Sequence, residues 1–332
     1  MEEKKKMNYH KEIKWSHILI GRMITFILTK RWGIKLLNAL EKKLHGISIK
    51  DLHCEEVDIP SLSEEGQKIR VRIFRPLNVK GKLPGMLYLH GGGFMIGNPE
   101  QFLTIIKQYI QKRPLVIVAP DYRKSLKNPY PAGFNDSYDT LLWMKRNAQK
   151  LGIIDEKFII GGHSAGGGLT AAISIKARDT NEVNIAFQMP IYPMLDHRQA
   201  TTSVQSMKKV PVWNTKTTEV AWALYLSDLI KQKESIPPYA SPALNENYND
   251  FPPTITFVAE LEPFKDEVIA YTNALRAAGV PVKFQLYEGV FHSFETIAPK
   301  TSMAKKANEF QYEAFAEYYD QFFGIINERK NK

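Results

Sequence analysis

One short run of residues, 158–168, constrains the fold of this chain more than any other part of the sequence. It reads FIIGGHSAGGG, an apolar strand followed by a serine framed by glycines and then by small residues that can start a helix. A serine at such a sharp strand–turn–helix junction adopts a strained backbone conformation, which only small neighbours tolerate. The run therefore predicts an α/β protein that exposes Ser164 at the end of a strand. Taken alone, a pattern this short equally fits a glycine-rich loop with an incidental serine.

Short apolar segments alternate with helical patterns along most of the chain. The segments expected to form strands are 86–89, 115–119, 158–160, 185–189, 254–258 and 282–287, and the expected helices are 101–111, 134–150, 167–178, 266–278 and 304–323. Strands without polar alternation are typical of a parallel sheet covered on both faces. Residues 67–74 do alternate, which predicts a half-exposed edge strand.

Two parts of the chain depart from this alternation. Residues 1–50 are basic and helix-rich, and a stretch at about 196–236 contains no clear strand but a helix over 217–230, capped by Asn214 or Thr215. An insertion of this length in a sheet protein is typical of a lid over a binding site. We expect residues 1–50 and this insertion to form a helical cap, and residues 51–332 to form the catalytic domain.

The charge of the chain is concentrated at its N-terminus. The formal net charge is +10, and residues 1–50 alone contain twelve Lys or Arg against four Glu. The nearly neutral remainder argues against a nucleic-acid groove, but an anionic membrane surface stays open for the N-terminal segment. There, Leu19, Met23, Phe26 and Ile27 share one helix face, which we expect to pack on the protein body, with membrane contact as the alternative.

A single cysteine, Cys54, excludes an internal disulfide and a thiolate metal cluster. No convincing secretory signal is present, because Arg22 interrupts the apolar stretch from Trp15 to Thr29 and no small-residue cleavage site follows it. These features predict a cytoplasmic protein.

A second glycine-rich segment, His90-Gly91-Gly92-Gly93-Phe94, directly follows the expected strand 86–89. Consecutive glycines let the backbone approach a ligand closely and present bare N–H groups, which can stabilise the oxyanion formed in acyl transfer. Such a loop can also hold phosphate, but the sequence has neither a P-loop nor a dinucleotide fingerprint. With the serine segment, the loop provides the complementary half of one site.

A serine nucleophile needs a base, and His292 is the strongest candidate. It lies in the segment EGVFHSF after the last expected strand, and an imidazole can take and return a proton near neutral pH. The competing histidines fit less well, because His163 is inside the serine turn, His90 is in the glycine loop and His197 is in the expected cap.

An acid must orient the histidine, and three carboxylates follow the expected strand 254–258. Glu262 comes just past the strand end and is our first choice, while Asp266 and Glu260 remain alternatives. The resulting order of serine, acid and histidine along the chain is that of an α/β-hydrolase.

From about residue 57 to 296, the chain resembles the hormone-sensitive-lipase-like branch of the α/β-hydrolase esterases. The resemblance is carried by HGGGF at 90–94, DYR at 121–123, YPA at 130–132, GHSAGG at 162–167, EPFKDE at 262–267 and FHSF at 291–294. It implies a mostly parallel eight-stranded sheet with a helical cap, and hydrolysis of carboxylic esters of short to medium acyl chain without cofactor or metal.

The resemblance also assigns roles to residues of this chain. Ser164 is the implied nucleophile and His292 the implied base, and Gly92, Gly93 and Ala165 are the implied oxyanion donors, with Gly91 as a further candidate. Two positions depart from the family, which usually has aspartate in place of Glu262 and often in place of His163.

The function expected from the sequence is therefore that of a serine esterase acting on a small-molecule ester. The aromatic residues expected to line its pocket from the cap are Phe26, Trp213, Trp222 and Tyr225. A deacetylase or amidase using the same groups, a membrane-peripheral lipid hydrolase and a catalytically silent binding protein are the rivals. The sequence does not fix the oligomeric state.

Overall fold

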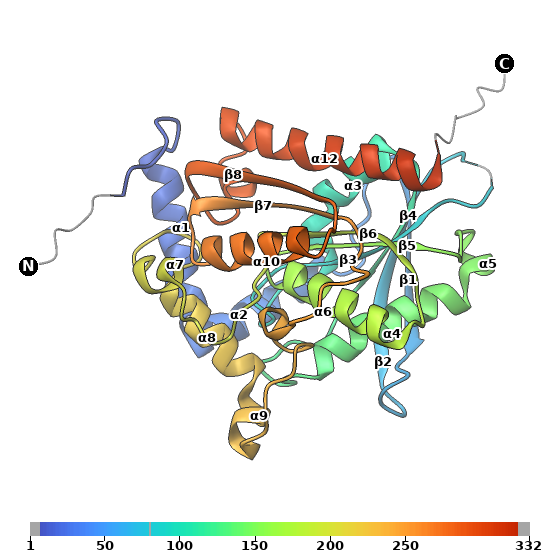
Figure 1. Ribbon diagram of the computed structural model, residues 1–332, viewed down its shortest axis with the longest axis horizontal. Coiled ribbons are helices and arrows are strands. Elements are labelled where there is room, and N and C mark those ends of the chain that lie inside the picture. Colours follow the sequence, from blue (N-terminus) through green and yellow to red (C-terminus); the bar gives the residue numbers. More distant parts are fainter. Residues whose placement is uncertain (1–6, 80, 325–332) are drawn as a thin grey trace, which may run out of the picture.

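Eight strands form one sheet through the centre of the protein, and helices cover both of its faces (Figure 1). The computed structural model describes residues 7–79 and 81–324. The strands are β1 (Leu52–Pro60), β2 (Lys68–Pro76), β3 (Gly85–Leu89), β4 (Val116–Pro120), β5 (Phe158–His163), β6 (Ile185–Ile191), β7 (Thr254–Leu261) and β8 (Val282–Phe291). Their order is β1-β2-β4-β3-β5-β6-β7-β8, and β2 runs antiparallel to both neighbours while the other pairs are parallel. The expected mostly parallel eight-stranded sheet is confirmed.

The helices form two layers. On one face lie α3 (Leu103–Lys112) and α12 (Ser302–Phe323), and on the other lie α4 (Ala132–Arg146), α6 (Ala165–Thr180) and α10 (Lys265–Ala277) (Figure 1). Shorter elements are η1 (Lys42–Leu44), η2 (Pro99–Phe102), α5 (Ala148–Leu151), η3 (Pro242–Leu244) and α11 (Phe294–Ile297). Because helices cover both faces, β3, β4 and β5 are buried along their whole length, which explains their unbroken apolar sequences.

The edge of the sheet differs from the expectation. Strand β2 was expected at the edge, but β1, which the sequence pattern did not reveal, pairs with its outer side. The alternation in β2 is misleading because Arg72, although charged, is 2% exposed, with its Nη1 2.5 Å from Oε1 of Glu100. A buried ion pair therefore replaces the solvated charges that an edge strand would carry.

The N-terminal segment and the insertion lie side by side in Figure 1. The segment contains α1 (Trp15–Leu28) and α2 (Arg31–Glu41), and the insertion contains α7 (Thr202–Ser206), α8 (Thr215–Tyr225) and α9 (Ser227–Gln232). The N-cap of α8 is Asn214, whose side chain accepts the N–H of Thr217 at 3.1 Å, so Asn214 rather than Thr215 caps the helix. The expected single helix over 217–230 is divided between α8 and α9.

Helix α1 packs on the protein through a different face from the one expected. The backbone N–H of Val212 donates to the carbonyl of Gly21 at 2.9 Å, and a Cβ on Gly21 would lie 2.5 Å from Pro211. The helix therefore uses its glycine side for close approach, while Met23 and Phe26 are each 58% exposed. The prediction that the face of Leu19, Met23, Phe26 and Ile27 packs on the body is wrong. Among residues 7–79 and 81–324, no helix combines the length and apolar character needed to cross a bilayer.

Candidate active site

Ser164 stands at the turn between β5 and α6, as the sequence predicted. Its φ of +58° and ψ of −117° lie in the left-handed half of the backbone map, where a serine is strained. The chain tolerates this turn because the residues two positions before and after Ser164, Gly162 and Gly166, are glycines. A Cβ on Gly162 would lie 2.5 Å from the carbonyl oxygen of Leu89, and one on Gly166 would lie 2.0 Å from the same oxygen. The glycines thus allow β5 and α6 to meet at the end of β3.

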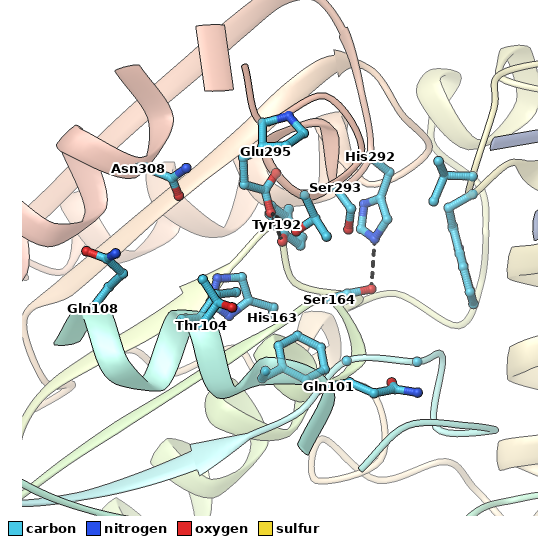
Figure 2. Close-up of a pocket in the computed structure, with 18 of the residues that line it drawn as sticks. Gln101, Thr104, Gln108, His163, Ser164, Tyr192, His292, Ser293, Glu295 and Asn308 are labelled. Carbon is cyan, nitrogen blue, oxygen red and sulfur yellow. Dashed lines mark hydrogen bonds between the residues drawn. The ribbon is translucent and has the colours of Figure 1, made fainter. Parts of the chain in front are cut away.

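Three side chains form a continuous hydrogen-bonded chain at this turn. Nε2 of His292 lies 2.9 Å from Oγ of Ser164, the contact drawn in Figure 2, and Nδ1 of the same ring lies 2.9 Å from Oε1 of Glu262. Glu262 is fully buried, and its Oε2 accepts the N–H of Ala259 at 3.0 Å. An acceptor-only carboxylate fixes a proton on Nδ1, which leaves Nε2 free to accept the proton of the serine.

The two alternative acids lie elsewhere. Asp266 accepts the backbone N–H of Ser203 at 2.7 Å, and Glu260 accepts that of Gly289 at 2.8 Å. Both carboxylates therefore support neighbouring loops, and of the three candidates Glu262 alone hydrogen-bonds to His292.

The other candidate histidines are held away from proton transfer with Ser164. Burial lowers the pKa of both His90 and His163 to about 3, so both rings are neutral at physiological pH. His90 stacks on Tyr122 with ring centroids 4.0 Å apart, and Nδ1 of His163 lies 2.9 Å from the hydroxyl of Tyr88. These contacts give the two histidines structural partners.

The glycine loop lies beside the serine. Gly91 and Gly92 line the same pocket as Ser164, and Gly92 and Gly93 have φ values of +121° and +60° that exclude most side chains. Within the described part of the chain, the N–H groups of Gly92, Gly93 and Ala165 make no hydrogen bond to another protein group. Free backbone donors next to a nucleophile can stabilise the oxyanion of an acyl-transfer intermediate.

A pocket of about 670 Å³ opens from Ser164 and runs between α3 and the α11–α12 region (Figure 2). Its far part is polar, with Thr104 and Gln108 from α3, Glu295 from α11 and Asn308 from α12. Sequence reasoning missed these residues, because their helices are far apart in the chain and only the fold brings them together. Glu295 carried one signal, since it follows His292 by three residues.

The aromatic residues expected from the cap are mostly not in this pocket. Trp213 lines it, and a Cβ on Gly93 would lie 2.2 Å from the indole. Trp222 and Tyr225 are instead buried against Phe94, and Phe26 is 58% exposed on the outer face of α1. The expectation for these three residues is therefore wrong: two fill the core next to Phe94, and the third faces outward because α1 packs through Gly21.

Known proteins resemble this chain both in sequence and in fold. Residues 86–296 match a family described as alpha/beta hydrolase fold. Carboxylesterase NlhH of Mycobacterium tuberculosis is 29% identical over 240 residues, which cover 72% of this chain and 75% of the relative. Ethyl acetate hydrolase of Pseudomonas putida is 28% identical over 240 residues, which cover 71% of this chain and 74% of the relative. Among solved structures, a bacterial heroin esterase superposes with a TM-score of 0.84 at 27% identity, covering 94% of this chain and 98% of the other.

Proposed function

Because the chain belongs to the hormone-sensitive-lipase-like branch of the alpha/beta hydrolases, we propose that it hydrolyses carboxylic esters through an acyl-enzyme formed on Ser164. The observation that carries the assignment of roles is the hydrogen-bonded chain from Ser164 through His292 to Glu262. A buried carboxylate, a histidine and a strained serine in this order can activate the hydroxyl.

The reaction follows from these contacts. His292 takes the proton of Ser164 as Oγ attacks the ester carbonyl, while Glu262 holds the ring and stabilises its positive charge. The N–H groups of Gly92, Gly93 and Ala165 donate hydrogen bonds to the carbonyl oxygen as it becomes negatively charged, with Gly91 as a further candidate donor. His292 then protonates the leaving alcohol, and water attacks the acyl-enzyme by the reverse sequence of proton transfers.

The pocket supports small-molecule esters of short to medium acyl chain as substrates. A volume of about 670 Å³ falls within the range of typical small-molecule sites, and the indole of Trp213 limits the space on the cap side of Ser164. In this proposal residues 1–50 and 196–236 form the cap, supported by the Val212–Gly21 hydrogen bond. A cytoplasmic location is part of the same proposal, supported by the single cysteine.

The experiment that tests this function is hydrolysis of p-nitrophenyl esters of rising acyl length by the wild type and by Ser164→Ala. We expect turnover of the shorter esters by the wild type and a loss of at least about 10³-fold in the variant. If no ester is cleaved faster by the wild type than by Ser164→Ala, the proposal fails. The matching p-nitroanilides distinguish an amidase, which would cleave them at comparable rates.

Peripheral membrane contact is a second candidate function, favoured by the surface of α1 and α2. Large apolar side chains are exposed along these helices, namely Trp15, Leu19, Ile20, Met23, Phe26, Trp32, Leu36 and Leu40. Residues 15–40 also contain four Lys or Arg and no acidic residue. An apolar face with cationic neighbours is the composition that binds the interface of an anionic bilayer.

Vesicle co-sedimentation tests the membrane proposal. We expect the intact protein to bind vesicles containing phosphatidylglycerol more strongly than pure phosphatidylcholine, and the double variant Met23→Ser with Phe26→Ser to lose most of this binding. Ile230→Ser, which removes an equally exposed apolar side chain from α9, is the matched control. Equal sedimentation of the double variant and the wild type would refute the proposal.

A further inference from the structure

The far part of the pocket contains a buried carboxylate that the proposed mechanism does not use. Glu295 is 4% exposed, and its Oε1 accepts a hydrogen bond from the hydroxyl of Tyr192. Its Oε2 has no hydrogen-bond partner among the described residues. Buried polar atoms are seldom left unpaired in proteins, so this atom indicates a site for a polar ligand group.

The charged side chains that line the pocket indicate whether the ligand group is positively or negatively charged. Glu295 and Glu309 contribute carboxylates, while none of the described residues that line the pocket is a lysine or an arginine. The aromatic rings of Phe102, Tyr192 and Tyr312 also line it. Carboxylates and aromatic faces both attract an ammonium ion, whereas an anion would find no lysine or arginine here.

The isolated carboxylate of Glu295 also shows what a ligand would supply. Burial raises the pKa of Glu295, because its charged form loses hydration that the hydroxyls of Tyr192 and Thr296, both at Oε1, do not replace. A cation bound at Oε2 would compensate that loss directly. The unfavourable burial of the acid would then become an attraction for one class of substrate.

Glu295 lies close enough to the reacting groups to act on a substrate. The ring of Tyr192, which donates to Glu295, packs edge-on against the ring of His292 with centroids 4.8 Å apart. Figure 2 shows Glu295, Tyr192 and His163 around the cavity that begins at Ser164. A substituent on a short arm of an ester bound at Ser164 can therefore reach this carboxylate.

We propose that this pocket binds the protonated amine of an amine-bearing ester, and that Glu295 is the residue that selects it. This inference rests on the proposed esterase function. Its substrate class is an ester with an aliphatic ammonium group on a short acyl or alcohol arm. The ammonium contacts Oε2 of Glu295 and lies against the aromatic walls, while the ester carbonyl is held at Ser164.

Two pairs of esters of equal shape test the inference. Dimethylaminoethyl butyrate and isoamyl butyrate differ in their alcohol arm by nitrogen for carbon, and ethyl dimethylaminobutanoate and ethyl isoheptanoate differ likewise in their acyl arm. The measured quantity is the ratio of kcat/KM for the amine to that for its carbon analogue. We expect a ratio above one in at least one pair for the wild type, and a fall of about tenfold in that ratio for Glu295→Gln, which keeps the size of the side chain and removes its charge.

Using a ratio separates this inference from other effects of the substitution. If the substitution disturbs His292 through Tyr192, the hydrolysis of both esters of a pair slows equally, and the ratio of their kcat/KM values does not change. Glu313→Gln is the matched control, because it removes a carboxylate from α12 outside the pocket lining and should leave the ratio unchanged. Equal ratios in the wild type and Glu295→Gln would overturn the inference alone, whereas failure of the wild type to exceed Ser164→Ala on any of the four esters would overturn the esterase proposal itself.

Discussion

Replacing Glu262 by glutamine should abolish most of the activity without unfolding the protein. The two carboxylate oxygens face two donors, Nδ1–H of His292 at 2.9 Å and the N–H of Ala259 at 3.0 Å. An amide has one acceptor, so one of these donors must face the NH₂ group of the glutamine. If that donor is Ala259, the unpaired buried groups cost about 1–3 kcal/mol of stability. If it is His292, the ring takes the other tautomer, and its Nε2–H can no longer accept the proton of Ser164.

The second arrangement sets the magnitude of the kinetic effect. Loss of the correct tautomer in a serine triad lowers kcat by about 10⁴-fold. Glu262→Asp should be milder, because aspartate keeps the negative charge and places no N–H donor beside Nδ1. It should still lose activity, because removing one methylene withdraws the carboxylate to about 4.4 Å from Nδ1, too far for a direct hydrogen bond. Steady-state hydrolysis of p-nitrophenyl butyrate measures both changes, and circular dichroism shows that the variants are folded.

Asp266→Asn is the matched control for this prediction. Its amide oxygen still accepts the N–H of Ser203, now 2.7 Å from the carboxylate, and no contact with His292 is involved. We expect its kcat to stay within about threefold of the wild type. The reasoning is refuted if Glu262→Gln keeps more than a tenth of the wild-type kcat, or if folded Asp266→Asn loses as much as Glu262→Gln.

Three further predictions follow from the site. Burial lowers the pKa of His163 to about 3 from 6.5, so between these pH values the unfolded chain binds more protons than the folded protein. The free energy of unfolding should therefore fall by up to about 1.4 kcal/mol per pH unit as the pH drops from 6.5 to 3. Urea titrations should show a shallower fall for His163→Gln, and the same fall as the wild type for His53→Gln, which replaces an exposed histidine. Gly92→Ala would place a Cβ 2.2 Å from a backbone oxygen at a φ of +121°, so we expect kcat to fall by about 10²-fold or more on p-nitrophenyl acetate. Trp213→Ala should raise the kcat/KM of octanoate relative to acetate esters by about tenfold, and no change in that ratio would show that the indole does not limit the acyl group.

The sequence predicted the parts of the site that local backbone chemistry determines. Ser164 and the glycine loop are recognisable because their turns demand glycines at fixed positions, and His292 because it follows the last strand. Glu262 could be preferred over Asp266 from the end of β7, but the choice depended on side-chain direction, and the structure places the carboxylate of Glu262 against His292. Strand β1 was not predicted, because it is a largely exposed edge strand with one buried residue.

The wall of the pocket was predicted poorly for a different reason. Hydrophobicity indicates that Trp222 and Tyr225 are covered, but it does not distinguish a core from a pocket. Phe26 belongs to a helix whose packing is decided by Gly21, a residue that no apolar pattern marks. Glu295 becomes visible as a pocket residue only when α11 is placed opposite α3.

The junction between Gly21 and Pro211 links two distant parts of the chain next to residues that line the pocket. Pro211 precedes Val212 and Trp213, which both line the cavity, and any side chain on Gly21 would press against this loop at 2.5 Å. A substitution in α1 can therefore displace the indole beside Ser164 without touching a reacting group. Natural variation confined to the first helix is thus a route by which descendants of this protein can acquire new substrate ranges while their chemistry stays the same.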